Sequence, residues 1–319
     1  DGASERREAI KAILAPLNDG DENGDHAYFD DDEDVRRAAL DWVANVDVLQ
    51  VPADPDDPEA VQKLRQRYIL ALFYMSTGGD ESWERTMNFL SGDDECRWFY
   101  LAGGTEGAFF PEDFFPEGAA CDSSGRVSSV SIWWNNLTGT LPPELSYLSD
   151  SLVKIDITGN HISGTIPLEY GKLTSLQVLF AMENCLSGTI PESLSDLPNL
   201  EQLTLDGNKD LTGSLNAFCD GTDKKSANLN HLSASCDGSH VGPASIQCDC
   251  CVCCDIATYD CYDPKDGSRL WNHANIGLNA AGRPSSFDKP CLSEYTVAYW
   301  EEHKNDTSWI TLGRGDGGF

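Results

Sequence analysis

A repeat between residues 127 and 218 constrains the fold more than any other feature of this chain. Four consecutive segments carry the same spacing of aliphatic residues and the same asparagine, glycine and proline positions, with a period of 24–25 residues. The recurring residues are Asn135, Asn160, Asn184 and Asn208, then Gly139, Gly164, Gly188 and Gly213, and then Pro142, Pro167 and Pro191. Self-similarity at such a period is typical of a solenoid, in which each repeat packs only on its neighbours.

The pattern within each segment is that of a leucine-rich repeat. A short strand turns its aliphatic side chains inward, and the asparagine that follows pairs buried backbone groups of the neighbouring turn. One rung cannot bury its own apolar edge, so rungs stack and the ends need caps. We therefore predict an α/β solenoid of about four rungs with parallel β-strands, a helical N-terminal cap and a disulfide-rich C-terminal cap.

Changes in composition and apolar spacing along the chain predict five segments. Before the repeats, apolar spacing predicts helices over residues 8–17, 35–46, 59–77 and 82–90. The segments are an acidic helical extension at 1–66, an N-terminal cap at 67–126, the repeats at 127–218, a Cys-rich cap at 219–254 and a C-terminal extension at 255–319.

Residues 35–254 resemble the plant-type extracellular leucine-rich-repeat proteins. The motifs LTGTLP, ISGTIP and LSGTIP have the LxGxIP form of that class, and a helix, Cys-x-Trp, Cys-Asp and GRV precede the first strand as in its N-terminal cap. The resemblance is closest to the proteins of diatoms and related algae, which also carry an AALDWVANVD-like helix and a Cys-rich cap. It implies extracellular recognition or a structural role, without a defined ligand.

The net charge of −31 and the pI near 4.2 argue against a nucleic acid or an anionic membrane surface as partner, because both repel such a chain. No apolar run approaches the roughly 20 residues that span a bilayer. No signal peptide is visible at Asp1, and if the protein is secreted we expect that its leader was removed or lies outside this sequence. The expected location is secreted, extracellular or at the cell surface.

The chain has twelve cysteines, and seven of them lie between Cys236 and Cys261. Such density in an acidic soluble chain indicates disulfides and an oxidising compartment. We expect Cys96–Cys121 as one pair and Cys219–Cys236 as the next, with neighbouring cysteines tied to different segments because adjacent residues pair poorly. The expected disulfide cysteines of the C-terminal part are Cys219, Cys236, Cys248, Cys250, Cys251, Cys253, Cys254, Cys261 and Cys291. Cys185 is left without an assigned partner, and a thiolate metal site at 248–254 is the alternative.

An acidic loop at residues 19–30 has the oxygen-bearing residues and the glycine of an EF-hand loop. The candidate calcium ligands are Asp19, Asp21, Asn23, Asp25 and Asp30. The alternative is a solvated acidic loop, because His26 replaces the usual aliphatic residue and Asp30 replaces the bidentate glutamate. No cofactor is required by the sequence, and calcium is the one that this loop suggests.

The outward-facing residues of the strands form the predicted partner-binding surface, because the concave face of a solenoid is its usual contact surface. The candidates are Trp133, Trp134, Lys154, Asp156, Phe180, Met182, Thr204 and Asp206. Large apolar groups at outward positions mark interaction sites. The alternative for the two tryptophans is that the Phe-rich stretch 100–118 folds over them.

Other motifs carry less weight. Asn136 and Asn305 lie in acceptor sequons for glycosylation, and Arg314-Gly315-Asp316 is an adhesion-like tripeptide that also arises by chance. The six histidines are scattered, and no nucleophile–histidine–acid set, P-loop or HExxH motif is present.

We therefore predict a non-enzymatic extracellular protein that recognises a protein or a glycan through its concave face. The alternative is a structural subunit of an extracellular filament, coat or matrix that assembles through its terminal extensions, with calcium as a candidate bridge.

Overall fold

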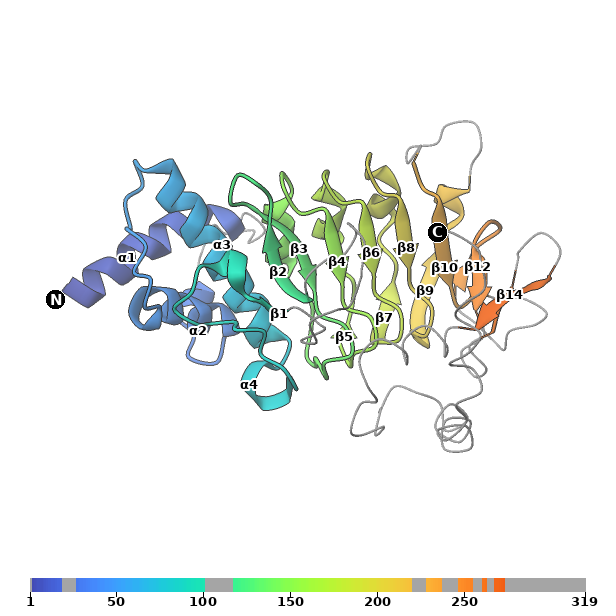
Figure 1. Cartoon of the computed structure of the whole chain (residues 1–319), viewed down its shortest axis with the longest axis horizontal. Helices are drawn as coiled ribbons and strands as arrows, with labels where there is room; N and C mark the ends of the chain where they lie inside the picture. The colour runs from blue at the N-terminus through green and yellow to red at the C-terminus, as the bar shows by residue number, and fades with distance from the viewer. Residues whose placement is uncertain are drawn as a thin grey trace, which may run out of the picture.

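The computed structural model describes residues 2–18, 27–100, 117–219, 228–236, 246–254, 260–262 and 267–272. Helices lie at one end of the molecule, and β-strands stack side by side along the rest of its length (Figure 1). The strands follow one another in chain order through the repeats, as expected for a solenoid.

Four α-helices form the N-terminal end. Their bounds are Gly2–Leu14 (α1), Val35–Asp41 (α2), Pro58–Ser76 (α3) and Gly79–Ser82 (α4), and a π-helical turn over Trp42–Val46 extends α2. The side chain of Asp57 caps α3 by accepting hydrogen bonds from the backbone N–H groups of Glu59 and Ala60 at 3.0 and 3.2 Å. Gly78, with φ of +95°, follows its C-terminal cap.

The helix predicted over residues 82–90 is wrong. The short helix α4 ends at Ser82, and Met87, Asn88 and Leu90 have positive φ angles of 52°, 60° and 61°. A backbone in the left-handed region cannot continue a right-handed helix. The apolar residues of this segment instead pack singly into the core, where Trp83 contacts Phe89 edge-on.

A buried arginine organises the helical end. Arg67 is fully buried on α3 and donates to Asp47 through two nitrogens, each at 2.6 Å, and to Glu95 at 3.2 Å. Its guanidinium also lies 5.4 Å from the ring centroid of Trp42 and 4.8 Å from that of Trp98. The charge is therefore compensated by two carboxylates and held between two indole rings, which is the environment that a buried guanidinium needs.

A ten-stranded sheet runs the length of the stack. Its strands, in spatial order, are Phe99–Tyr100 (β1), Glu117–Cys121 (β2), Val127–Ser131 (β3), Lys154–Asp156 (β4), Val178–Phe180 (β6), Gln202–Thr204 (β8), His231–Ala234 (β10), Val252–Cys254 (β12), Asp260–Tyr262 (β13) and Arg269–Asn272 (β14). Pairing is parallel from β3 to β12 and antiparallel at both ends. The parallel ladder thus extends beyond the four predicted rungs, because β10 and β12 of the expected C-terminal cap continue it.

A second, smaller sheet runs beside the first. It contains Ser163–Gly164 (β5), Cys185–Thr189 (β7), Asp210–Ser214 (β9) and Ile246–Gln247 (β11), all in parallel (Figure 1). The returning side of each rung carries a short 3₁₀ helix, over Pro143–Leu148 (η5), Leu168–Lys172 (η6), Glu192–Asp196 (η7) and Asn216–Phe218 (η8). The aliphatic side chains of the rungs fill the space between these walls.

The recurring asparagines form the expected ladder. The carbonyl oxygen of the Asn160 side chain accepts hydrogen bonds from the N–H groups of Asn135 and Leu137 at 3.0 Å, and its amide donates to the carbonyl of Ile132 at 2.8 Å. Asn184 and Asn208 donate to the preceding rung in the same way. The buried turn of each rung is therefore paired by its neighbour's side chain.

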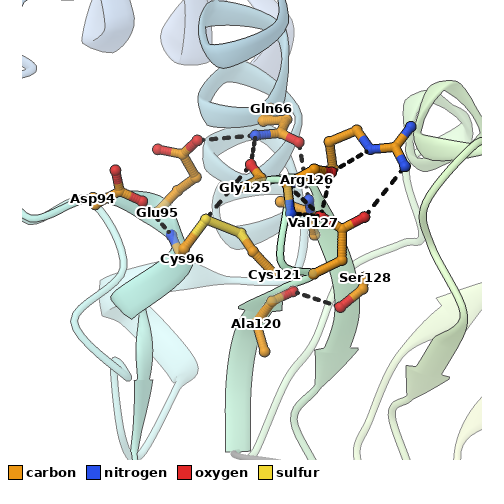
Figure 2. The surroundings of a disulfide bond; sticks show 12 residues. Gln66, Asp94, Glu95, Cys96, Ala120, Cys121, Gly125, Arg126, Val127 and Ser128 are labelled. Atoms are coloured by element: carbon orange, nitrogen blue, oxygen red, sulfur yellow. Dashed lines mark hydrogen bonds and ion pairs between the residues drawn. A yellow bond between two sulfur atoms is a disulfide. The ribbon is translucent and has the colours of Figure 1, made fainter.

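The predicted disulfide Cys96–Cys121 is present and joins the N-terminal cap to β2 (Figure 2). Beside it, Gln66 on α3 donates to Glu95 and to the carbonyl of Gly125 and accepts from the N–H of Val127 at 2.9 Å. One amide side chain therefore ties the longest helix to the start of the first rung.

The pairing predicted for Cys219 with Cys236 is wrong. The structure pairs Cys219–Cys250, Cys236–Cys253, Cys248–Cys251 and Cys254–Cys261. The expectation that clustered cysteines reach different segments also fails at Cys248 and Cys251, because three residues of separation bring their Cα atoms to 5.6 Å. Cys236 faces Cys253 because β10 pairs with β12. Cys185 is itself disulfide-bonded, and Cys291 lies outside the described residues.

Among the described residues, no helix combines the length and the apolar character that a membrane crossing requires.

Candidate binding surface

The strands of the large sheet bring their outward side chains into three rows. Within a strand such as β4, Ile155 points into the core, so Lys154 and Asp156 lie on the opposite face. The register and the two-residue spacing give rows of Ser129, Lys154, Val178, Gln202 and His231; of Ser131, Asp156, Phe180, Thr204 and Ser233; and of Trp133, Thr158, Met182, Asp206 and Ser235. Most of the predicted binding residues therefore share one face.

The large residues of this face are more open than the small ones. Trp133, Lys154, Val178, Phe180 and Met182 are half-buried. The short polar residues beside them are closed to solvent, and these are Ser129, Ser131, Asp156, Thr158, Thr204, Asp206 and Ser233. The accessible part of the predicted surface is therefore an apolar ledge, defined here as Val178, Phe180 and Met182, together with Lys154 and Trp133.

Lys154 is held beside this ledge by two contacts. Its ammonium lies 3.3 Å from a carboxylate oxygen of Asp156 and 5.8 Å from the centroid of the Phe180 ring. The aromatic face and the carboxylate both attract the cation, so its position is defined rather than free in solvent. The ammonium group of Lys154 and the ring of Phe180 therefore lie next to each other on the outward face of the sheet.

Several hydroxyl groups on the same face of the sheet are buried, and most of them have no hydrogen-bond partner among the described residues. The hydroxyl of Ser233 donates to Asp206 at 2.5 Å. The hydroxyls of Ser129, Thr158 and Thr204 are buried and have no hydrogen-bond partner among the described residues. Buried polar groups are paired in nearly all structures, so this cluster is a departure from the norm.

The two tryptophans occupy different environments. Trp133 belongs to the outward row, as predicted. Trp134 has a positive φ of 47°, and its ring lies against Gly159, where an added Cβ would come within 2.3 Å of the ring. Trp134 thus packs on the next rung and is not part of the ledge. Most of the stretch expected to cover the pair, residues 101–116, lies outside the described residues.

Next to Trp133, an ion pair closes the N-terminal edge of the face. Arg85 donates to the buried carboxylate of Glu117 at 2.6 and 3.0 Å, and its backbone N–H donates to Asn135 at 2.8 Å. Burial raises the pKa of Glu117 to about 7; the Arg85 guanidinium opposes this shift, and Asp156 adds to it. No sequence motif pointed to this pair, because Arg85 and Glu117 meet only through the fold.

The predicted calcium loop is only partly described. Asp30 accepts from the ammonium of Lys11 at 2.8 and 2.9 Å, and this contact leads the effects that lower the pKa of Asp30. Its carboxylate is therefore engaged with a cation of the protein. Asp19, Asp21, Asn23 and Asp25 lie outside the described residues, so calcium binding stays a prediction.

The first predicted glycosylation site is partly enclosed. The amide of Asn136 donates to the carbonyl of Ser82 at 2.8 Å, and the residue is half-buried with φ of 59°. Asn305 and the Arg314-Gly315-Asp316 tripeptide lie outside the described residues. Modification at either asparagine stays a prediction.

With this geometry in view, comparison with known proteins identifies the repeats. Residues 150–209 match the family model described as leucine rich repeat. Over 118 residues the chain is 30% identical to the receptor-like kinase TMK2 of Arabidopsis thaliana, and the match covers 37% of this chain and 11% of TMK2. The chain thus spans about a tenth of that relative's length.

Two solved structures are similar to part of this chain. The crystal structure of PEPR1–AtPEP1 is 27% identical with a TM-score of 0.37, and the match covers 54% of this chain and 21% of that chain. The LRR ectodomain of the receptor kinase SOBIR1 from Arabidopsis thaliana is 30% identical with a TM-score of 0.33, and the match covers 38% and 69% of the two chains. From the family match and the described rungs, the repeat region has the leucine-rich-repeat fold, and its sequence relative TMK2 is a plant receptor-like kinase.

Proposed function

We propose that this protein is a non-enzymatic extracellular binding protein that recognises a protein or glycan partner through the apolar ledge on its concave sheet. The observation that carries the proposal is the half-open group of Val178, Phe180 and Met182 beside the cation of Lys154. Aromatic side chains next to a positioned charge are the residues on which binding energy concentrates in protein interfaces. An aromatic face is also a surface on which the apolar face of a sugar ring can pack.

Two further features support the proposal. The disulfides of the described residues favour an oxidising compartment outside the cell. The sequence relative TMK2 of Arabidopsis thaliana is named a receptor-like kinase, which is consistent with a role in recognition. The hydroxyls of Ser129, Thr158 and Thr204 add hydrogen-bonding capacity beneath the ledge.

The test is binding of the full chain to a glycan array and to a displayed library of random peptides, at physiological salt. Phe180→Ala is expected to weaken the selected binder by about tenfold or more, as for a hot-spot aromatic residue. Leu168→Ala is the matched control, because Leu168 is a 68% exposed hydrophobic residue on the opposite wall of the rung.

Equal losses in the two variants, or no selected binder from either source, would contradict the proposal. Native mass measured with and without a chelator adds an independent reading. Polymers that depend on calcium would favour the structural-subunit alternative and overturn a simple receptor role.

A further inference from the structure

A cavity of about 410 Å³ lies where the helical cap meets the first rung, on the side of that rung that carries η5. Its walls come from the start of α2, from the C-terminal half of α3 and from the segment that leads into η5. The lining residues are Glu33, Asp34, Val35, Arg36, Leu72, Ser76 and residues 140–144. A cavity of this volume is within the range that holds small ligands.

The single cation in the lining is already engaged. The guanidinium of Arg36 donates to both carboxylate oxygens of Asp34 at 2.9 and 2.6 Å, and it lies 4.4 Å from the ring centroid of Tyr28. Glu33 and Glu144 are the remaining charged residues of the lining. Once the Arg36–Asp34 pair is set aside, the cavity carries only acidic groups.

Glu144 is an unusual acid because it is 3% exposed and forms no ion pair within the described residues. Its carboxylate interacts with its own backbone N–H, and among the described residues no side chain donates a hydrogen bond to it. Tyr68 lies one turn before Leu72 on α3, so both residues are on the same helix face. The Tyr68 hydroxyl is fully buried and has no partner among the described residues.

The chemistry of a ligand follows from the Glu144 carboxylate, which lines the cavity and forms no ion pair among the described residues, and from the unpartnered Tyr68 hydroxyl one turn before Leu72 on α3. A protonated amine pairs with a buried carboxylate through short, charge-assisted hydrogen bonds. Leu72, Val35 and Leu141 offer apolar surface to a short hydrocarbon stem. We propose that this cavity binds an alkylammonium group, with its charge at Glu144 and its stem on these three residues. The group comes either from a free aliphatic amine or from a lysine side chain of a protein.

The surroundings of Glu144 predict how binding depends on pH. Burial raises the pKa of Glu144, Arg36 opposes the shift, and Asp34 and Glu169 add to it; Tyr68 and Tyr170 are neutral neighbours at these pH values. The uncharged form of the acid cannot pair with an ammonium. The affinity is therefore expected to rise as Glu144 loses its proton, and to fall again only where the amine itself deprotonates.

The experiment is calorimetric titration of the full chain with n-butylammonium, with Nα-acetyl-lysine methylamide and, as the neutral analogue, with n-butanol. Both amines are expected to bind more tightly than butanol. Glu144→Gln is expected to reduce amine affinity by at least about tenfold, the effect of losing a hydrogen bond to a charged group. Tyr68→Phe, which keeps the ring, is expected to reduce it by a smaller factor.

Glu192→Gln is the control for the loss of one negative charge, because Glu192 is exposed on η7 in a later repeat and lies outside the cavity lining. Unchanged affinity in that variant, and in Phe180→Ala, is expected, so this proposal and the one for the apolar ledge fail separately. Tighter binding of butylammonium assigns the site to free amines, and tighter binding of the lysine derivative assigns it to a protein side chain. Butanol binding equal to the amines, or full affinity in a folded Glu144→Gln variant, would overturn the proposal.

Discussion

The two ends of the repeat stack are closed by different physical means. The N-terminal end is covered by helices with a continuous apolar core, a buried arginine and one disulfide. Among its described residues, the C-terminal end has short strands and four disulfides between Cys219 and Cys261, with far fewer large buried side chains. Burial of apolar surface stabilises the first end, and restriction of the unfolded chain stabilises the second. A solenoid end therefore needs a cap, but the repeats do not dictate its kind.

The largest effect is expected at the buried arginine of the N-terminal end. Arg67→Met leaves the carboxylates of Asp47 and Glu95 buried without their cation, which is expected to cost about 3–5 kcal/mol in the free energy of unfolding. Thermal unfolding followed by tryptophan fluorescence measures it. Arg65→Met is the control, because Arg65 is half-buried and, within the described part of the chain, donates only to the carbonyl of Ile13. Similar costs in the two variants would refute the central role of Arg67.

At the C-terminal end, removal of the bridge between β10 and β12 is the matching change. The double substitution of Cys236 and Cys253 by serine opens a loop with a separation of 17 residues, which is expected to cost about 3 kcal/mol. The same change at Cys248 and Cys251, separated by three residues, is expected to cost less, because a short loop restricts the unfolded chain less. Urea denaturation measures both. Equal costs would show that chain restriction is not the dominant contribution.

A substitution in the middle of the stack gives a stability change with which the changes at both ends can be compared. Asn160→Ala leaves the buried N–H groups of Asn135 and Leu137 without an acceptor, at an expected cost of about 1–3 kcal/mol. Asn199→Ala removes one exposed hydrogen bond to Thr174 and is expected to change stability by less than about 0.5 kcal/mol. Hydrogen exchange would locate the loss. Protection lost at the caps rather than in adjoining rungs would argue against a local ladder.

The smallest effect is a pH dependence at the N-terminal edge. The pKa of Glu117 is about 7 in the folded protein, above the 4.5 of an ordinary glutamate. Between these values the folded chain holds a proton that the unfolded chain has released, so this group lowers stability as pH rises from about 4.5 to about 7. Glu117→Gln removes the contribution.

We expect the melting temperature of the Glu117→Gln variant to fall less than that of the wild type between pH 5 and pH 8. A larger fall in the variant would show that the ion pair with Arg85 keeps Glu117 charged and reverses the sign. Glu81→Gln, at an exposed position on α4, is the control for the loss of one negative charge.

The repeat pattern predicted the rungs well because it records contacts that every rung repeats. Asn160, Asn184 and Asn208 pair the backbone of their neighbours as expected. The pattern also predicted which side chains face outward. Exposure was harder to predict, because the small residues Ser129, Thr204 and Asp206 are closed to solvent while Phe180 remains half-open.

The repeat period by itself determined the parallel stack, its inward aliphatic residues and the asparagine ladder, because these depend on contacts between equivalent positions. Only the tertiary structure decided the contacts that differ between equivalent positions of the repeats or that involve residues outside them. Glu144 and Glu169 occupy the same place in successive repeats, yet α2 and α3 enclose only Glu144 in a cavity. Cys236 meets Cys253 because β10 and β12 extend the ladder. Such contacts join segments distant in sequence, and no local pattern encodes their distance or their burial.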